Sequence, residues 1–363
     1  MNARDGFRSG IEMMQQSARL MGMAPGSSLF CDWRELDNKF EAFRLFQYAD
    51  RELGGPVDRL PLDEVVRRAL TLETFRAIWI LEGVGQIRAA ASNLSVRGML
   101  TEGSGSNLPD RAMIPLHAGM GTAFGEKLLG ALGPNPAAPE VRRAVEEFVG
   151  LCRANCRPGW EDACMEPLGL VARCLYPHLL SAVSAAMEGV SPDLRGLFWH
   201  GVGRSLYFVP TNFLPIPGAH GRMLRSAAAE GGRVEDRRQA LAGLIWAVTL
   251  VNLPQPAVIR SLLPICWEMK MQAEFRNGLI SALLVWRHMA PGDLRHLVHY
   301  SRPLPAPDPN AVLWKAWVEA PTRDALENIF PGLDRANRIP ALYSYRTAEE
   351  LREMSEVSSG QRI

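Results

Sequence analysis

Six glycines lie inside segments that otherwise have the pattern of buried helices, and they constrain the fold of this 363-residue chain more than any other feature. Glycine in a helix interior costs about 1 kcal/mol relative to alanine, because it gives the unfolded backbone more freedom. Because such a glycine recurs in six helical segments, we predict helix pairs whose backbones approach too closely for a Cβ atom. The first glycines of the six stretches are Gly83, Gly119, Gly169, Gly201, Gly243 and Gly278.

Successive glycines in this series lie 32 to 50 residues apart, which is the range of two-helix repeats. A unit of one amphipathic helix and one glycine-bearing helix cannot bury its apolar face alone, so stacked units would share a core. We therefore predict an all-α protein built as a degenerate two-helix repeat array of the α-solenoid type, which can curl into a compact body. A globular helical domain with coincidental glycines is the alternative. Only residues 205–209 and 341–345 resemble strands, and both weakly.

Proline and glycine clusters suggest three parts. Residues 1–55 are predicted to be an N-terminal helical extension that ends at Gly54-Gly55-Pro56. Residues 56–300 would form the glycine-helix repeat domain. Residues 301–363 would comprise a proline-rich linker, short helices and a polar tail.

The charge balance excludes several partner classes. A net charge of +1 gives no electrostatic footprint for nucleic acid or an anionic membrane surface. The first 20 residues carry charges and glutamines and have no apolar core of a secretory signal. The most apolar stretch, residues 241–251, is about half of what spans a bilayer. We expect a cytoplasmic protein with no membrane span and no nucleic-acid partner.

The cysteine pattern favours thiols over disulfides. Six cysteines in a large chain without a secretory signal are expected to be buried thiols. Cys152 and Cys156 are four residues apart on a predicted helix and would share a face. Together with Cys164 or Cys174 they could bind a metal, but the spacing matches no zinc or iron–sulfur pattern.

Polar side chains beside the glycines are the candidates for a functional site. If the glycine helices line one inner surface, these groups would converge there, with tryptophans forming the floor of an apolar pocket. The candidates are Glu82, His117, Glu166, His200, Arg204, Trp199 and Trp246. Two histidines with two carboxylates (Glu82, His117, Glu166 and His200) also match a helical metal site, although the usual Glu-x-x-His motif is absent. The alternative is that each group is a satisfied polar residue bridging neighbouring helices. No nucleophile or cofactor motif is present.

One segment carries a family resemblance. The sequence from Pro192-Asp-Leu-Arg-Gly-Leu-Phe-Trp-His-Gly-Val-Gly-Arg-Ser-Leu to Val209 resembles the repeated element of an uncharacterised bacterial family found in enediyne-type polyketide gene clusters. Residues 116–124 are the next best copy, and the resemblance covers roughly residues 70–290. The units at Gly169, Gly243 and Gly278 keep one glycine and lose the second. The resemblance implies a bacterial specialised-metabolite pathway and contact with a long, polyunsaturated intermediate, and it supplies no catalytic residues.

Three functions remain open from the sequence. The first is an accessory protein that binds an apolar intermediate in a helical cavity, with or without chemistry. The second is an α-helical scaffold that presents a groove to a partner protein. The third is a metal-dependent helical enzyme. The sequence leaves open whether the protein is an enzyme and whether it forms a homo-oligomer.

Overall fold

The glycine-bearing helices pack side by side in chain order. The computed structural model describes residues 28–92, 94–213 and 218–356, and this part of the chain is helical without any β-strand. Each glycine helix packs on the next one along the chain. The six helices are α5 (Thr74–Ala91), α6 (Met113–Gly130), α9 (Pro167–Leu175), α11 (Pro192–Tyr207), α13 (Val234–Val251) and α15 (Gln272–Met289). The prediction of an all-α protein is confirmed.

The glycines lie where two helix backbones touch. A Cβ atom built on Gly203 of α11 would lie 1.8 Å from the carbonyl oxygen of Ala240 on α13. A Cβ atom on Gly243 of α13 would lie 2.0 Å from the carbonyl oxygen of His200 on α11. Reciprocal pairs of the same kind join α5 to α6 through Gly85 and Gly119, and α9 to α11 through Gly169 and Gly201. The predicted reason for these glycines, close backbone approach, is therefore the observed one.

The Gly-x-Gly stretches serve two neighbours at once. In α5, a Cβ atom on Gly83 would collide with Phe46 of the N-terminal helix α2 (Ser28–Gln47), whereas one on Gly85 would collide with Leu116 of α6. In α11, Gly201 faces Glu166, directly before α9, and Gly203 faces α13. The two glycines thus point to opposite sides of one helix.

Amphipathic helices surround this row. α7 (Ala138–Asn155) packs on α6 and α10 (Leu180–Val190), and α10 packs on α11. α12 (Ala219–Ala229) packs on α13, and α14 (Pro256–Glu268) lies between α13 and α15. α4 (Leu62–Ala69) packs on α5. The row also curves, because His288 of α15 lies 3.4 Å from the carbonyl oxygen of Asp110, just before α6.

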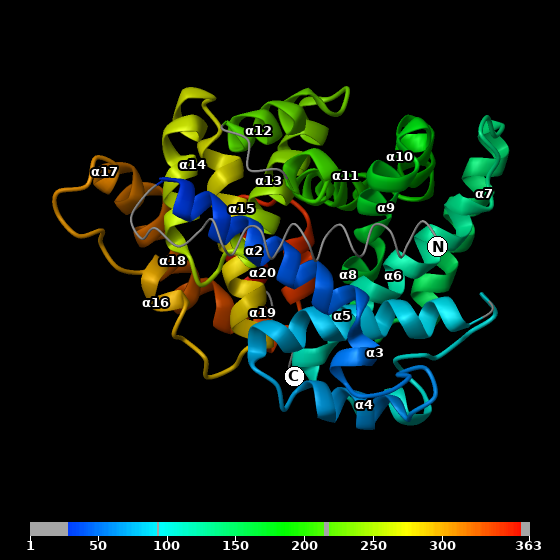
Figure 1. The fold of residues 1–363 in the computed structure, drawn as a ribbon. Helices are drawn as coiled ribbons and strands as arrows, with labels where there is room; N and C mark the ends of the chain where they lie inside the picture. Colours follow the sequence, from blue (N-terminus) through cyan, green and yellow to red (C-terminus); the bar gives the residue numbers. More distant parts are fainter. Residues whose placement is uncertain (1–27, 93, 214–217, 357–363) are drawn as a thin grey trace.

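The helix α2 (Ser28–Gln47) crosses the front of the row and contacts α5, α13 and α14 (Figure 1). The short helix α3 (Ala49–Glu52) follows and packs on α5. Of the predicted N-terminal extension, residues 1–27 lie outside the described part of the chain. The remainder packs on α5 at one end of the glycine-helix row and on α13 near the other end.

The C-terminal part returns to the middle of the row. α16 (Leu297–Tyr300) precedes a proline-rich stretch, and a helix then runs from α17 (Ala311–Trp314) through α18 (Ala320–Asp324) to α19 (Phe330–Arg335). Two π-helical turns, Lys315–Glu319 and Ala325–Ile329, come just before Pro321 and Pro331. A proline ring lacks an N–H group and clashes with the carbonyl one turn earlier, which the wider turns accommodate.

Residues 337–346, here named the C-terminal segment, follow α19 and pack on α8 (Glu161–Met165) and α15. The segment contains the 3₁₀ turn Ile339–Tyr343 and leads into α20 (Ala348–Glu356), which packs back on α19. Both weak strand predictions are wrong, because residues 205–207 end α11 and residues 341–343 belong to this turn. Local β propensity is overridden there by helical packing.

Candidate functional site: a buried ionic cluster under Tyr343

Four of the predicted polar residues meet inside the protein. Glu166 Oε1 lies 3.0 Å from His200 Nδ1, and Glu166 Oε2 lies 3.2 Å from Arg204 Nη1. Arg204 Nη2 lies 3.3 Å from Glu82 Oε1. Glu166, His200 and Arg204 are buried, and only 13% of the Glu82 side chain is exposed. We call these four residues the ionic cluster; they come from α5, the α8–α9 junction and α11.

The close helix crossings hold the backbone of this cluster in place. The carbonyl oxygen of Glu82 faces Gly119, that of Glu166 faces Gly201, and that of His200 faces Gly243. Each of these carbonyls would be within about 2 Å of a Cβ atom at the opposing glycine. Three of the four cluster residues therefore sit at the points where the glycine helices touch.

Burial and charge set the protonation of the cluster. Burial raises the pKa of Glu82, and the nearby Glu166 carboxylate adds to this effect against the opposing charge of Arg204. Burial opposes the charge on Arg204, but Glu166 and Glu82 outweigh it and raise the pKa of this guanidinium. Because a carboxylate oxygen only accepts, His200 Nδ1 donates to Glu166. His200 Nε2 is then left buried without a hydrogen-bond partner among the residues that the structure describes.

Aromatic rings cover the cluster. The Trp246 ring lies 6.0 Å from the His200 ring and 5.7 Å from the Arg204 guanidinium. Tyr343 of the C-terminal segment lies 5.4 Å from Trp246 and 6.2 Å from His200, measured between ring centroids. Burial raises the pKa of Tyr343; the charge of Arg204 opposes this effect, and the charges of Glu166 and Glu82 add to it. Like His200 Nε2, the indole nitrogen of Trp246 is buried and has no hydrogen-bond partner in the described part of the chain.

The C-terminal segment is fixed over this site by hydrogen bonds. Asn277 of α15 donates to the carbonyl of Arg346 at 2.5 Å, and Gln239 of α13 accepts from the Tyr345 N–H at 2.6 Å. Leu342 and Tyr343 are fully buried. The inner surface that we expected to be an open apolar cavity is therefore filled by this segment.

Two predicted site residues lie elsewhere. His117 Nδ1 bonds the Met113 carbonyl at 2.6 Å, and its Nε2 accepts from the Arg157 N–H at 3.1 Å. Burial lowers the pKa of His117 to about 4. Trp199 donates to Ser184 on α10 at 2.9 Å, away from the cluster. Both residues are therefore hydrogen-bonded polar groups that bridge neighbouring parts of the chain, which is the alternative interpretation given above.

The predicted metal set is accordingly not assembled. His117 uses both ring nitrogens in bonds to the backbone, whereas Glu82 and Glu166 pair with Arg204 and His200 pairs with Glu166. Across residues 28–92, 94–213 and 218–356, no three His, Cys, Asp or Glu side chains are arranged to hold a metal ion. An arginine between two carboxylates supplies the positive charge that a metal would supply.

Two clefts open elsewhere on the protein. One has a volume of about 560 Å³ and lies between α2 and the start of α5, with Glu41, Arg76 and His296 among its lining residues. The other, of about 60 Å³, lies between α5 and the end of α15. Neither is lined by a residue of the ionic cluster or by Trp199 or Trp246. In the large cleft, Arg44 and Arg76 are already paired with Glu41 and Glu52.

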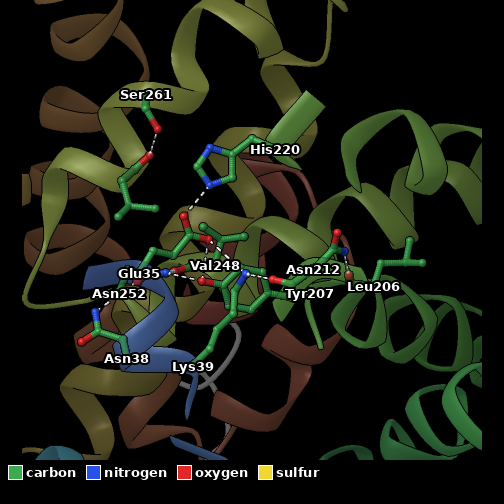
Figure 2. A network of polar contacts seen from close by, with 11 residues as sticks. Glu35, Asn38, Lys39, Leu206, Tyr207, Asn212, His220, Val248, Asn252 and Ser261 are labelled. Carbon is green, nitrogen blue, oxygen red and sulfur yellow. Dashed lines mark hydrogen bonds and ion pairs between the residues drawn. The ribbon is translucent and has the colours of Figure 1, made fainter. Parts of the chain in front are cut away.

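A second buried polar network joins α2 to the ends of α11 and α13 (Figure 2). The Glu35 carboxylate accepts from Tyr207 at 2.9 Å and pairs with His220 at 2.7 Å and Lys39 at 3.3 Å. Burial opposes ionisation of Glu35, but Lys39 and His220 outweigh it and lower its pKa to about 2. Lys39 also donates to the Asn212 carbonyl at 3.0 Å. The charges are satisfied within the network, so it acts as a clamp on α2.

Sequence reasoning missed this clamp and Tyr343. A signal for the clamp was present, because Glu35 and Lys39 are four residues apart and adjoin the apolar positions Leu36 and Phe40 of one helix. Tyr343 had no such signal. It lies 139 positions after Arg204 in the sequence, and only the return of the C-terminal segment brings it to the cluster.

Comparisons with known proteins give no relative: no family model, no curated protein and no solved structure matches the chain. Within the described ranges, no single helix has the length and apolarity needed to cross a membrane. The bent pair Glu161–Leu175 and Pro177–Val190 meets that test by length and composition only, with a bend of 118°.

Proposed function

We propose that this protein binds an unsaturated, largely apolar small molecule against His200 and Trp246, in the place that Tyr343 occupies. Its role would be that of an accessory protein in a bacterial specialised-metabolite pathway. The observation that carries the proposal is the position of the Tyr343 ring, which packs against both Trp246 and His200, and His200 belongs to the buried ionic cluster.

Energetics support a binding role for this cluster. Replacing a buried ion pair by apolar residues of similar volume is often neutral or stabilising, so stability alone does not explain such a cluster. Ionisable groups with perturbed pKa values are concentrated at functional sites. His200 Nε2 and the Trp246 indole nitrogen are also left unsatisfied, at a cost of about 1–3 kcal/mol each. A ligand with a polar substituent could recover that free energy.

Tyr343 would act as a built-in competitor for the ligand. Burial of Leu342 and Tyr343 stabilises the closed segment by about 1.5–3 kcal/mol for each side chain. A ligand that displaces the phenol ring must first overcome that stabilisation, which weakens its apparent affinity. The resemblance to the enediyne-associated family favours a conjugated, polyunsaturated molecule as the ligand.

Removal of the phenol ring tests the proposal. A fluorescent conjugated tetraene alcohol serves as the probe, and its binding is titrated against the wild-type protein and Tyr343→Ala. We expect Tyr343→Ala to bind the probe at least about tenfold more tightly, which corresponds to about 1.4 kcal/mol. The probe should also raise the thermal midpoint of Tyr343→Ala by mass action.

Tyr300→Ala is the matched control. Tyr300 is also fully buried and packs on an aromatic ring, that of Trp314 at 6.2 Å, but it bonds the Leu253 carbonyl and is not part of the cluster. Both substitutions leave a cavity of the same size class. Equal probe binding by the two variants would refute the proposal, and so would the absence of saturable binding to Tyr343→Ala.

A further inference from the structure

Three cysteine thiols come together where α7 meets α8. Cys152 and Cys156 lie at the end of α7, and Cys164 lies in α8 after a short connecting turn. The Sγ atoms of Cys152 and Cys164 are 3.3 Å apart, and Cys164 also interacts with the Cys156 thiol. All three are buried and free, with 4% of Cys156 exposed.

This arrangement differs from that of an isolated buried thiol such as Cys266. A disulfide has an S–S distance of about 2.05 Å, so Cys152 and Cys164 are about 1.3 Å from bonding distance. The backbone of α8 is held from the other side, because a Cβ atom on Gly121 would lie 1.9 Å from the Cys164 carbonyl oxygen. The thiols are thus held against each other by two helices with little freedom to separate.

We propose that Cys152 and Cys164 are a modification site at which a peroxide forms an intramolecular disulfide. The Sγ of Cys152 attacks one peroxide oxygen and the O–O bond breaks. The departing oxygen takes the thiol proton, giving a sulfenic acid and one water. The Sγ of Cys164 then attacks the Cys152 sulfur and the S–O bond breaks, and the leaving hydroxide takes the Cys164 proton as a second water. Two thiols lose two electrons, which reduce hydrogen peroxide to two waters.

The site would link oxidation to the ionic cluster through α8. Glu166 is two residues after Cys164, and its side chain holds both His200 and Arg204. Burial raises the pKa of all three thiols, so they stay protonated and react slowly. The disulfide should therefore form on sustained exposure to peroxide and be removed by a dithiol reductant.

Thiol counting by mass spectrometry tests this proposal. Folded wild-type protein is incubated with hydrogen peroxide, denatured, and labelled with N-ethylmaleimide. We expect two fewer labels on the oxidised protein, a tryptic cross-link between residues 144–153 and 154–173, and restoration of both labels by dithiothreitol. Because residues 154–173 contain both Cys156 and Cys164, the same cross-link must persist in Cys156→Ser.

Cys266→Ser is the matched control, since it removes a buried thiol outside the trio and should leave the cross-link unchanged. The wild-type result is informative even if Cys152→Ser does not fold. Full labelling of the peroxide-treated wild type would overturn the proposal. Loss of the cross-link in folded Cys156→Ser, or oxidation confined to the exposed Cys174, would also overturn it.

Discussion

Substitution of Gly203 by alanine tests whether close backbone approach is the reason for the glycines. The new Cβ atom would lie 1.8 Å from the carbonyl oxygen of Ala240, 2.5 Å from its carbonyl carbon and 2.7 Å from its Cα atom. An ordinary contact begins at 3.4 Å, so α11 and α13 would have to separate by 1.6 Å along this direction. A gap of 0.5–1 Å already forfeits about a quarter to a half of the dispersion energy of the atoms it separates.

Two opposing effects determine whether Gly203→Ala raises or lowers the free energy of unfolding. Alanine improves helix propensity by about 1 kcal/mol over glycine. Overpacking a core costs about 1–3 kcal/mol, and the upper end applies because the obstructing atoms belong to a backbone and cannot change rotamer. We expect Gly203→Ala to lower the free energy of unfolding by about 2 kcal/mol or more. Urea unfolding followed by circular dichroism measures this change.

Gly150→Ala is the control for this experiment. Gly150 lies on an exposed part of α7, and a Cβ atom there would have no neighbour within 4 Å among the described residues. Only the gain in helix propensity remains, so the free energy of unfolding of this variant should rise by about 0.5–1 kcal/mol. If Gly203→Ala were as stable as Gly150→Ala, the explanation of the glycines by close approach would be refuted.

Two further predictions concern buried charge. The pKa of Glu35 is about 2 in the folded protein, well below its ordinary value of 4.5, so the stabilisation from its charge is complete above pH 4.5 and is lost as the pH falls toward 2. Between pH 5 and pH 2 the free energy of unfolding, measured in urea, should therefore fall by about 3 kcal/mol more for the wild type than for Glu35→Gln. Parallel pH profiles of the two proteins would contradict a stabilising role for the Glu35 charge. Arg204→Met should cost about 3–5 kcal/mol by leaving two carboxylates without their cation, whereas Glu82→Gln should cost less than about 1 kcal/mol because burial already disfavours the Glu82 charge. Equal decreases in the free energy of unfolding for these two variants would show that Arg204 is not the centre of the cluster.

The helix content and the role of the glycines could be predicted because both depend on local sequence. A glycine in an apolar helical stretch has a distinct cost, and six such costs at similar spacing indicate helix crossings. The convergence of Glu82, Glu166, His200 and Arg204 followed from the same logic, since each lies within three residues of a helix glycine. His117 met the same criterion and lies elsewhere, because proximity to a glycine does not specify which side of the helix a side chain faces.

The filled interior could not be predicted from local pattern. Whether the inner surface is open or covered depends on residues 337–346. These residues contain a short 3₁₀ turn and show no periodic pattern of apolar residues. Their place is set by contacts with α8, α13 and α15, such as the bond from Asn277 to Arg346. Contacts between segments so distant in sequence form only in the tertiary structure, and a single sequence carries no record of them.

The positions of the glycines and of the ionic cluster have one physical cause. Where two helices touch at glycine, the backbones come within contact distance and side chains at the neighbouring positions are brought inward together. Glu82, Glu166 and His200 provide the carbonyls at three such contacts; the two glutamate side chains meet at Arg204, and His200 pairs with Glu166. A wider crossing would move these groups beyond hydrogen-bond distance and leave buried charges unpaired, which is more costly than the glycines themselves. The glycines therefore do more than permit packing, because the same contacts hold the charges of the cluster at hydrogen-bond distance from one another.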